Sequence, residues 1–296
     1  MAAVRRQKTS KLKELADTIQ SRLPERTQRA MTAAREKGAS SWLTALPLAD
    51  YGFSFSKADF RDAVHLRYGW HPPRLPSQCV CGKDFSVDHS LSCSHGGYLS
   101  IRHNEVRDVI GDLLDETCVN LRREPVLQSL EGEQLHRSAN TAPDARLDIC
   151  ANGFWSDDRH RKAFFDVRIF HPHAQSYRRQ AIDKVYRSHE WEKRRNYEER
   201  VLQVEQGTFT PLVFSSTGGA GPAASAFLKR LSSQLAAKKD TDYSTTMGWL
   251  RCRLSFALIR CCILCLRGSR SKRHLPEEQV MQPDLAISEG QVSLSN

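Results

Sequence analysis

The chain has 296 residues, of which 40% are hydrophobic, and 44 Lys and Arg against 34 Asp and Glu give it a formal net charge of +10 at pH 7. This apolar content excludes a wholly disordered chain and is enough for one large or two small domains. A basic chain favours a polyanionic partner, DNA or RNA, because lysine and arginine release counterions when they bind phosphates.

Residues 1–40 predict a basic helical arm. The segment has no apolar run between its charges, so it does not resemble a secretory signal. The nine cysteines of a chain without such a signal are expected to be reduced thiols, some of them metal ligands. Residues 41–78 predict a helical segment, with Ser56 or Lys57 near the cap of a helix over 58–69.

Four potential metal ligands gather within residues 79–97. They are Cys79, Cys81, His89 and Cys93. Three thiolates and one imidazole predict a tetrahedral Zn²⁺ site, with Gly82 turning the chain and His95 as a competing ligand. Four protein ligands fill a tetrahedral zinc, so we expect this ion to be structural and not catalytic.

Residues 98–240 alternate between helical and strand-like patterns. Helices are predicted from the apolar spacing over 102–116, the charged run over roughly 176–204 and the segment 223–239. The stretches "EPVLQ", "ARLDICA", "KAFFDVRIF" and "FTPLVFSS" are rich in β-branched or aromatic residues and predict strands. We therefore expect an α/β fold with a mixed sheet flanked by helices.

The segment 254–266 is strongly apolar, but it is 13 residues long and contains Arg260. It is too short to span a bilayer, so it predicts a buried helix within 241–272 that packs on the core, and no membrane partner. Residues 273–296 are polar and aperiodic and predict a disordered tail.

Two acidic residues belong to neighbouring predicted strands. Asp148 and Asp166 are eighteen residues apart, and their side chains could converge on Mg²⁺ or Mn²⁺. Arg168 lies two residues beyond Asp166 and would face the same side of the strand. A metal held by two carboxylates can activate a water while a nearby cation stabilises the charge on a cleaved phosphodiester.

These motifs together resemble the restriction-like endonuclease at the C-terminal end of site-specific non-LTR retrotransposon proteins. The resemblance rests on the Cys-Cys-His-Cys knot, "RHNEVRD", "EPVL", "ARLDI", "FFDVRIF", "EKRRNYEERV" and "FTPLVFSSTGG", over roughly residues 79–215. It implies the PD-(D/E)XK nuclease fold over 98–240 with an upstream zinc knuckle, in a transposon-derived orphan chain. The implied activity is Mg²⁺-dependent nicking of DNA in the nucleus.

The resemblance also implies roles for individual residues. Asp148 and Asp166 would hold the metal, and Asp144 of the Pro-Asp pair is an alternative to Asp148. Glu105 would be an additional acidic ligand. A cluster of polar residues matches the family's Arg-His-Asn signature and is expected to contact DNA: Arg102, His103 and Asn104.

A lysine and a tyrosine of the family could be placed in two ways. Lys193 with Tyr197, or Lys184 with Tyr186, would lie near the scissile phosphate. We favour Lys193 and Tyr197 because they are one helical turn apart and share a face with His189.

Two functions that involve nucleic acid remain open on the sequence alone, beside a zinc-stapled interaction module that would show no salt-sensitive DNA binding. The first is a metal-dependent DNA endonuclease. The alternative is a catalytically inactive zinc-knuckle protein that keeps the nuclease fold and binds nucleic acid, because Arg168 stands where many such nucleases carry lysine and arginine cannot act as a base. The basic clusters "EKRRN" and "RGSRSKR" would contact phosphates or serve nuclear import.

Overall fold

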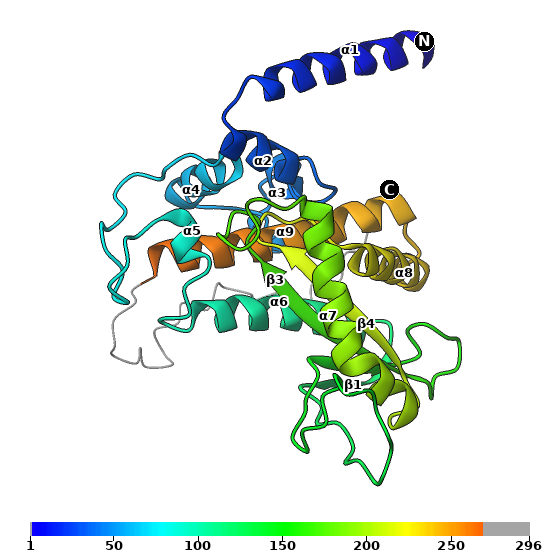
Figure 1. Ribbon diagram of the computed structural model, residues 1–296. Coiled ribbons are helices and arrows are strands. Elements are labelled where there is room, and N and C mark those ends of the chain that lie inside the picture. The colour runs from blue at the N-terminus through cyan, green and yellow to red at the C-terminus, as the bar shows by residue number, and fades with distance from the viewer. Residues whose placement is uncertain (1, 269–296) are drawn as a thin grey trace.

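A four-stranded mixed sheet lies at the centre of the computed structural model, which describes residues 2–268 (Figure 1). Its strands, in spatial order, are β1 (Val119–Arg123), β2 (Ile149–Asn152), β3 (Lys162–Phe170) and β4 (Thr208–Ser215). β2 is antiparallel to both β1 and β3, whereas β4 is parallel to β3. The predicted mixed sheet is therefore confirmed.

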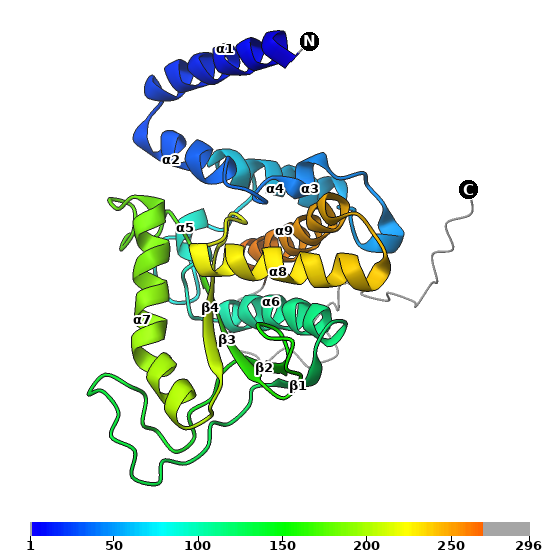
Figure 2. The ribbon, with the colours of Figure 1, turned by 90° about the vertical axis from the view of Figure 1, so that its right-hand side faces the viewer.

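Helices cover both faces of this sheet (Figure 2). The helices of the described residues are α1 (Ala2–Ser21), α2 (Glu25–Ala34), α3 (Ser41–Thr44), α4 (Lys57–Tyr68), α5 (Val87–Ser90), α6 (Tyr98–Asp115), α7 (Ile182–Gln203), α8 (Pro222–Lys239) and α9 (Tyr243–Arg267), with a 3₁₀ turn at Ala49–Tyr51. The main apolar core joins one face of the sheet to α6, α8 and α9. Smaller apolar clusters join the other face to α7.

The side chains of β3 alternate between these two faces, as the pleat of a strand requires. Phe165 and Val167 enter the main core, whereas Phe164 and Phe170 pack in the clusters that contain α7. Asp166 shares the face of Phe164 and Phe170, and only 5% of it is exposed. The strand therefore buries a carboxyl group beneath α7.

The predicted arm divides into two parts. α1 projects from the body of the molecule (Figure 1), while α2 packs against it. Ala33 in α2 is fully buried, and the Arg29 guanidinium donates to the backbone carbonyl oxygens of Pro172, Tyr177 and Gln180. Only the first helix is thus an arm, because small apolar residues and this arginine anchor the second one.

The first strand lies one segment earlier than predicted. Residues 124–128 form no strand, apart from a single bridge between Val126 and Arg146, and β1 precedes them. The sequence of β1 is "VNLRR", and its side chains are mostly exposed. An edge strand held by backbone hydrogen bonds needs little burial, so it lacks the apolar alternation that marked the other strands.

The last helix agrees with its prediction. α9 lies within the predicted segment 241–272 and buries Leu254, Leu258 and Cys265. No helix in the described part of the chain is long and apolar enough to cross a membrane. The predicted disordered tail, 273–296, lies outside the described residues.

Candidate functional site

Two carboxyl groups meet where β2 and β3 pair. Ile149 is the antiparallel partner of Phe165, so the residues before and after them, Asp148 and Asp166, stand opposite each other. Directly opposed residues have Cβ atoms about 5 Å apart. The two carboxyl groups are close enough for each to shift the pKa of the other. The structure thus brings together the two acidic residues that the sequence singled out as metal ligands.

Asp148 is held in its ionised form by its neighbours. The backbone N–H of Val167 donates to its Oδ2 at 2.5 Å, and His103 Nε2 lies 3.1 Å from the same oxygen. Burial disfavours the charged carboxylate, but the hydrogen bond and charge of His103 outweigh it and lower the pKa of Asp148. Burial also disfavours the imidazolium, yet Asp148 raises the pKa of His103.

The pKa of Asp166 is shifted in the opposite direction from that of Asp148. Burial raises its pKa to about 7, and the negative charge of Asp148 adds to the rise, although the Lys193 ammonium opposes it. Lys193 Nζ lies 2.7 Å from Asp166 Oδ2. A carboxyl group that titrates near neutrality beside an ionised carboxylate carries the shared proton of the pair.

This pair predicts a pH-dependent stability. Between pH 4 and pH 7 the folded chain binds a proton at Asp166 that the unfolded chain lacks, so the free energy of unfolding falls as pH rises. The slope is at most about 1.4 kcal/mol per pH unit for one proton. The side chain of Asp166→Asn cannot ionise. In urea unfolding, the free energy of unfolding of this variant relative to that of the wild type should therefore increase from pH 4 to pH 7. Parallel stability curves would contradict this assignment.

α7 supplies the other side chains near the carboxyl pair. Lys193 Nζ lies 5.9 Å from the ring centroid of Tyr197, and the Tyr197 hydroxyl accepts a hydrogen bond from Asn140 Nδ2 at 3.2 Å. Arg168 emerges from β3 two residues beyond Asp166, with Nη1 3.7 Å from Glu192 Oε1. Of these side chains, Lys193 contacts the pair itself, whereas Tyr197 lies next to Lys193 and Arg168 contacts Glu192 of α7.

The alternative placement of the lysine and tyrosine is not at this site. Lys184 is exposed, while Tyr186 is buried and donates its hydroxyl to Glu36 Oε2 at 3.2 Å. The alternative aspartate is also elsewhere, because Asp144 is exposed in the turn before β2. Of the open alternatives, the structure brings Lys193 and Asp148 to Asp166.

Three predicted residues of α6 point in different directions, because consecutive residues of a helix are about 100° apart. His103 faces the carboxyl pair, and Asn104 is exposed with Oδ1 3.3 Å from His103 Nδ1. Arg102, the third of these residues expected to contact DNA, is only 4% exposed and donates to the Leu91 carbonyl oxygen at 3.3 Å. It joins α6 to the cysteine-rich segment instead.

The predicted acidic ligand on α6 is also misplaced. Glu105 is two residues from His103, so it points roughly 200° away from it around the helix. It lines a groove of about 900 Å³ with Arg260 and Cys261 of α9. This groove lies on the face of α6 opposite His103, so Glu105 does not join the carboxyl pair. Sequence reasoning assigned His103 to DNA, and its contact with Asp148 depends on a register that the sequence does not show.

The cysteine-rich segment forms the predicted cluster. The ligand atoms of Cys79, Cys81, His89 and Cys93 all lie within 4.8 Å of one another, and His95 is not among them. Cys79 Sγ lies 4.0 Å from Cys93 Sγ, and Cys81 Sγ lies 3.3 Å from His89 Nε2. Thiolates around a tetrahedral Zn²⁺ stand about 3.8 Å apart, given Zn–S bonds of about 2.3 Å. The cluster could therefore hold a metal ion such as zinc.

Local structure explains how these ligands converge. Gly82 adopts a positive φ of 84° and donates its N–H to the Cys79 carbonyl oxygen, which turns the chain between the first two cysteines and His89. Ser86 caps α5 by accepting a hydrogen bond from the His89 N–H. We call residues 79–93 the zinc module.

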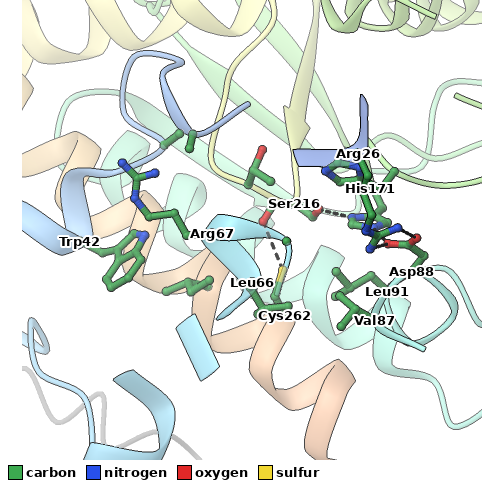
Figure 3. A pocket seen from close by; sticks show the side chains of 16 residues that line it. Arg26, Trp42, Leu66, Arg67, Val87, Asp88, Leu91, His171, Ser216 and Cys262 are labelled. Atoms are coloured by element: carbon green, nitrogen blue, oxygen red, sulfur yellow. Dashed lines mark hydrogen bonds and ion pairs between the residues drawn. The ribbon is translucent and has the colours of Figure 1, made fainter. Parts of the chain in front are cut away.

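Polar contacts fix the zinc module to the sheet (Figure 3). Asp88 accepts two hydrogen bonds from Arg26, at 2.5 and 2.9 Å, and its Oδ1 lies 3.0 Å from His171 Nε2. The other ring nitrogen of His171 lies 2.9 Å from Ser216 Oγ. His171 directly follows β3 and Ser216 directly follows β4. One carboxylate thus ties α2 and the zinc module to the ends of both parallel strands.

We expect Asp88→Ala to lower the free energy of unfolding by about 1–3 kcal/mol, because it leaves the buried His171 without its partner and also removes the ion pair with the exposed Arg26. Urea unfolding measures the change. The matched control is Asp108→Ala, whose carboxylate is 46% exposed beside Arg107 and Arg123 and whose loss should change stability by less than about 1 kcal/mol. Equal effects of the two substitutions would contradict the role of Asp88.

Comparison of the sequence with models of known protein families and with curated proteins gives no match.

Proposed function

We propose that the chain is a metal-dependent DNA endonuclease with the PD-(D/E)XK fold. The observation that carries the proposal is the pairing of Asp148 with Asp166 across two adjacent strands, with Lys193 against Asp166. A helix before the sheet, three antiparallel strands and a parallel strand after α7 support the assignment to this fold. The resemblance to retrotransposon endonucleases supports a transposon-derived origin and a nuclear location.

The carboxyl pair suits a hard divalent cation. Two carboxylates offer the oxygen ligands that Mg²⁺ and Mn²⁺ prefer, and a cation between them would neutralise the negative charge of the pair. A bound Mg²⁺ lowers the pKa of a water ligand and polarises a phosphoryl oxygen. Asp148 and Asp166 would hold the ion.

The remaining side chains have separate tasks in this proposal. His103 orients Asp148 through its contact with Oδ2. Lys193, which loses its ion pair once Asp166 binds a cation, supplies positive charge to the phosphate being cut. Arg168 adds a second positive charge at the rim, where its side chain is 35% exposed. The structural zinc stands apart from this chemistry, because all four ligands of its cluster come from the protein.

A plasmid assay tests the proposal. Wild-type protein is incubated with supercoiled plasmid in Mg²⁺, in Mn²⁺ and without a divalent cation, and DNA binding is measured in parallel. We expect nicked plasmid to accumulate with either ion and not without one. Binding without nicking in both ions would reject the endonuclease.

One observation favours a second candidate, the inactive nucleic-acid-binding protein. Lys193 Nζ lies 2.7 Å from an oxygen that must bind the metal, and Arg168 is the cation on the strand of Asp166 where many such nucleases have lysine. An arginine cannot take a proton from water. This candidate predicts salt-sensitive DNA binding that is unchanged by Mg²⁺ and by substitution of Asp166.

A further inference from the structure

The face of α7 that points away from the sheet carries an unusual set of side chains. They are Lys184, Arg187, Trp191 and Arg195. Their spacing of three, four and four residues places them on one side of the helix, and all four are exposed. Trp191 is 59% exposed although it is the largest apolar side chain of α7. We call these four residues the outer face of α7.

Charge on the outer face is available to a ligand. Within the described part of the chain, none of Lys184, Arg187 and Arg195 forms a salt bridge, whereas Lys193 and Arg194 of the same helix are paired with Asp166 and Glu198. The turn before α7 adds two further exposed basic residues, Arg178 and Arg179. An anion that binds here therefore displaces no carboxylate from the three side chains.

Trp191 lies among the basic side chains of the outer face. The Arg195 guanidinium lies 4.6 Å from the centre of its indole ring, a distance at which the cation is attracted to the ring face. An exposed aromatic ring among basic residues is the combination by which proteins bind single strands, since the ring stacks on a base and the cations follow the phosphates. In a duplex the faces of the bases are covered by their neighbours.

We propose that the outer face of α7 binds unpaired, single-stranded nucleic acid, with Trp191 stacked on a base and Lys184, Arg187 and Arg195 against the flanking phosphates. The biological role of this binding rests on the proposed endonuclease activity. A nick creates a strand end that can leave the duplex and bind to the outer face. The outer face lies on the opposite side of α7 from Lys193, about one helix diameter of 10 Å away. A strand end released at the carboxyl pair needs only to pass around this helix.

A binding experiment without added divalent cation tests the inference, since no cleavage then occurs. A labelled oligothymidylate and a labelled duplex of equal length are titrated with the full chain. We expect Trp191→Ala to weaken binding of the single strand about tenfold or more and to change duplex binding less than twofold. Trp70→Ala is the matched control, because Trp70 is 52% exposed in a different part of the fold and should change neither.

Charge and stacking are separated by a second variant. Arg187→Glu should lower the affinity for both the single strand and the duplex and reduce the salt dependence of binding. It removes a phosphate contact and leaves the indole in place. The inference is overturned if Trp191→Ala leaves single-strand affinity unchanged, if it lowers single-strand and duplex affinity equally, or if a polyglutamate peptide binds as tightly as the oligonucleotide.

The two proposals fail in different ways. Trp191-dependent binding of a single strand, together with no nicking by the wild type, would reject the endonuclease and keep the binding face. Metal-dependent nicking of plasmid that is lost in Asp166→Asn, together with equal single-strand affinity of wild type and Trp191→Ala, would do the reverse.

Discussion

Asp166→Asn and Asp148→Asn should each lower Mg²⁺-dependent nicking about a thousandfold or more, while DNA binding changes less than about threefold. The expected loss follows from the proposed role of the pair, in which each aspartate would supply a ligand to one shared ion and a bound metal would contribute several kcal/mol to catalysis. Asparagine keeps the size of the side chain and can still donate a hydrogen bond to the other carboxylate. The measurement is the initial rate of plasmid nicking at saturating Mg²⁺.

Two other acidic residues that the sequence analysis considered as metal ligands, Asp144 and Glu105, serve as controls. Asp144 is exposed in a turn, and Glu105 lines the groove on the other side of α6. Asp144→Asn and Glu105→Gln should therefore retain nicking within about twofold. A loss of activity in Glu105→Gln equal to that of Asp166→Asn would show that the active site lies elsewhere, and unchanged nicking in both aspartate variants would exclude the carboxyl pair.

Loss of the zinc ligands should produce the largest change in stability. Cys79 is 5% exposed and is one of the four clustered ligands, so Cys79→Ser is expected to release the ion. The zinc module contains little regular structure beyond the four residues of α5, so we expect a metal held by its four ligands to stabilise its fold. We expect the melting temperature to fall by roughly 10 °C, which corresponds to about 3 kcal/mol in a chain of this size.

Zinc content and melting temperature are measured on the same samples. Cys252→Ser is the matched control, since this thiol is half-buried on α9 and lies outside the cluster. It should leave about one zinc ion per chain and the melting temperature within about 2 °C of wild type. A wild-type protein that contains no zinc, or a Cys79→Ser variant that melts with the wild type, would contradict a structural metal.

Patterns along the chain predicted those parts of the fold that bury apolar side chains. β3, β4 and α6 have strong periodicity, because the core takes alternate residues from a strand and every third or fourth residue from a helix. β1 lacks such a pattern, since it is an exposed edge strand. The packing of α2 was also not predicted. It depends on hydrogen bonds from Arg29 to three backbone carbonyl oxygens that lie more than 140 residues further along the chain.

The candidate site was predictable where one element determines the direction of its side chains. Asp166 and Arg168 are two apart on a strand, and Lys193 and Tyr197 are one turn apart on a helix. Directions set by contacts between elements were not predictable. Arg102 and Glu105 belong to the same quoted motif as His103, yet α6 sends the first toward Leu91 and the second into a groove against α9. The contacts of Arg102 and Glu105 depend on how α6 packs against the rest of the fold, and the local sequence pattern does not predict that packing.

The proposed endonuclease requires Asp148 and Asp166 to share one divalent cation. A crystal soaked in Mn²⁺ tests it directly, because anomalous scattering locates manganese without reference to activity. We expect one anomalous peak between the two carboxylates, with Lys193 Nζ withdrawn from Asp166 Oδ2. A crystal in which the Lys193–Asp166 ion pair persists at saturating Mn²⁺, with no peak between the carboxylates, would contradict the account.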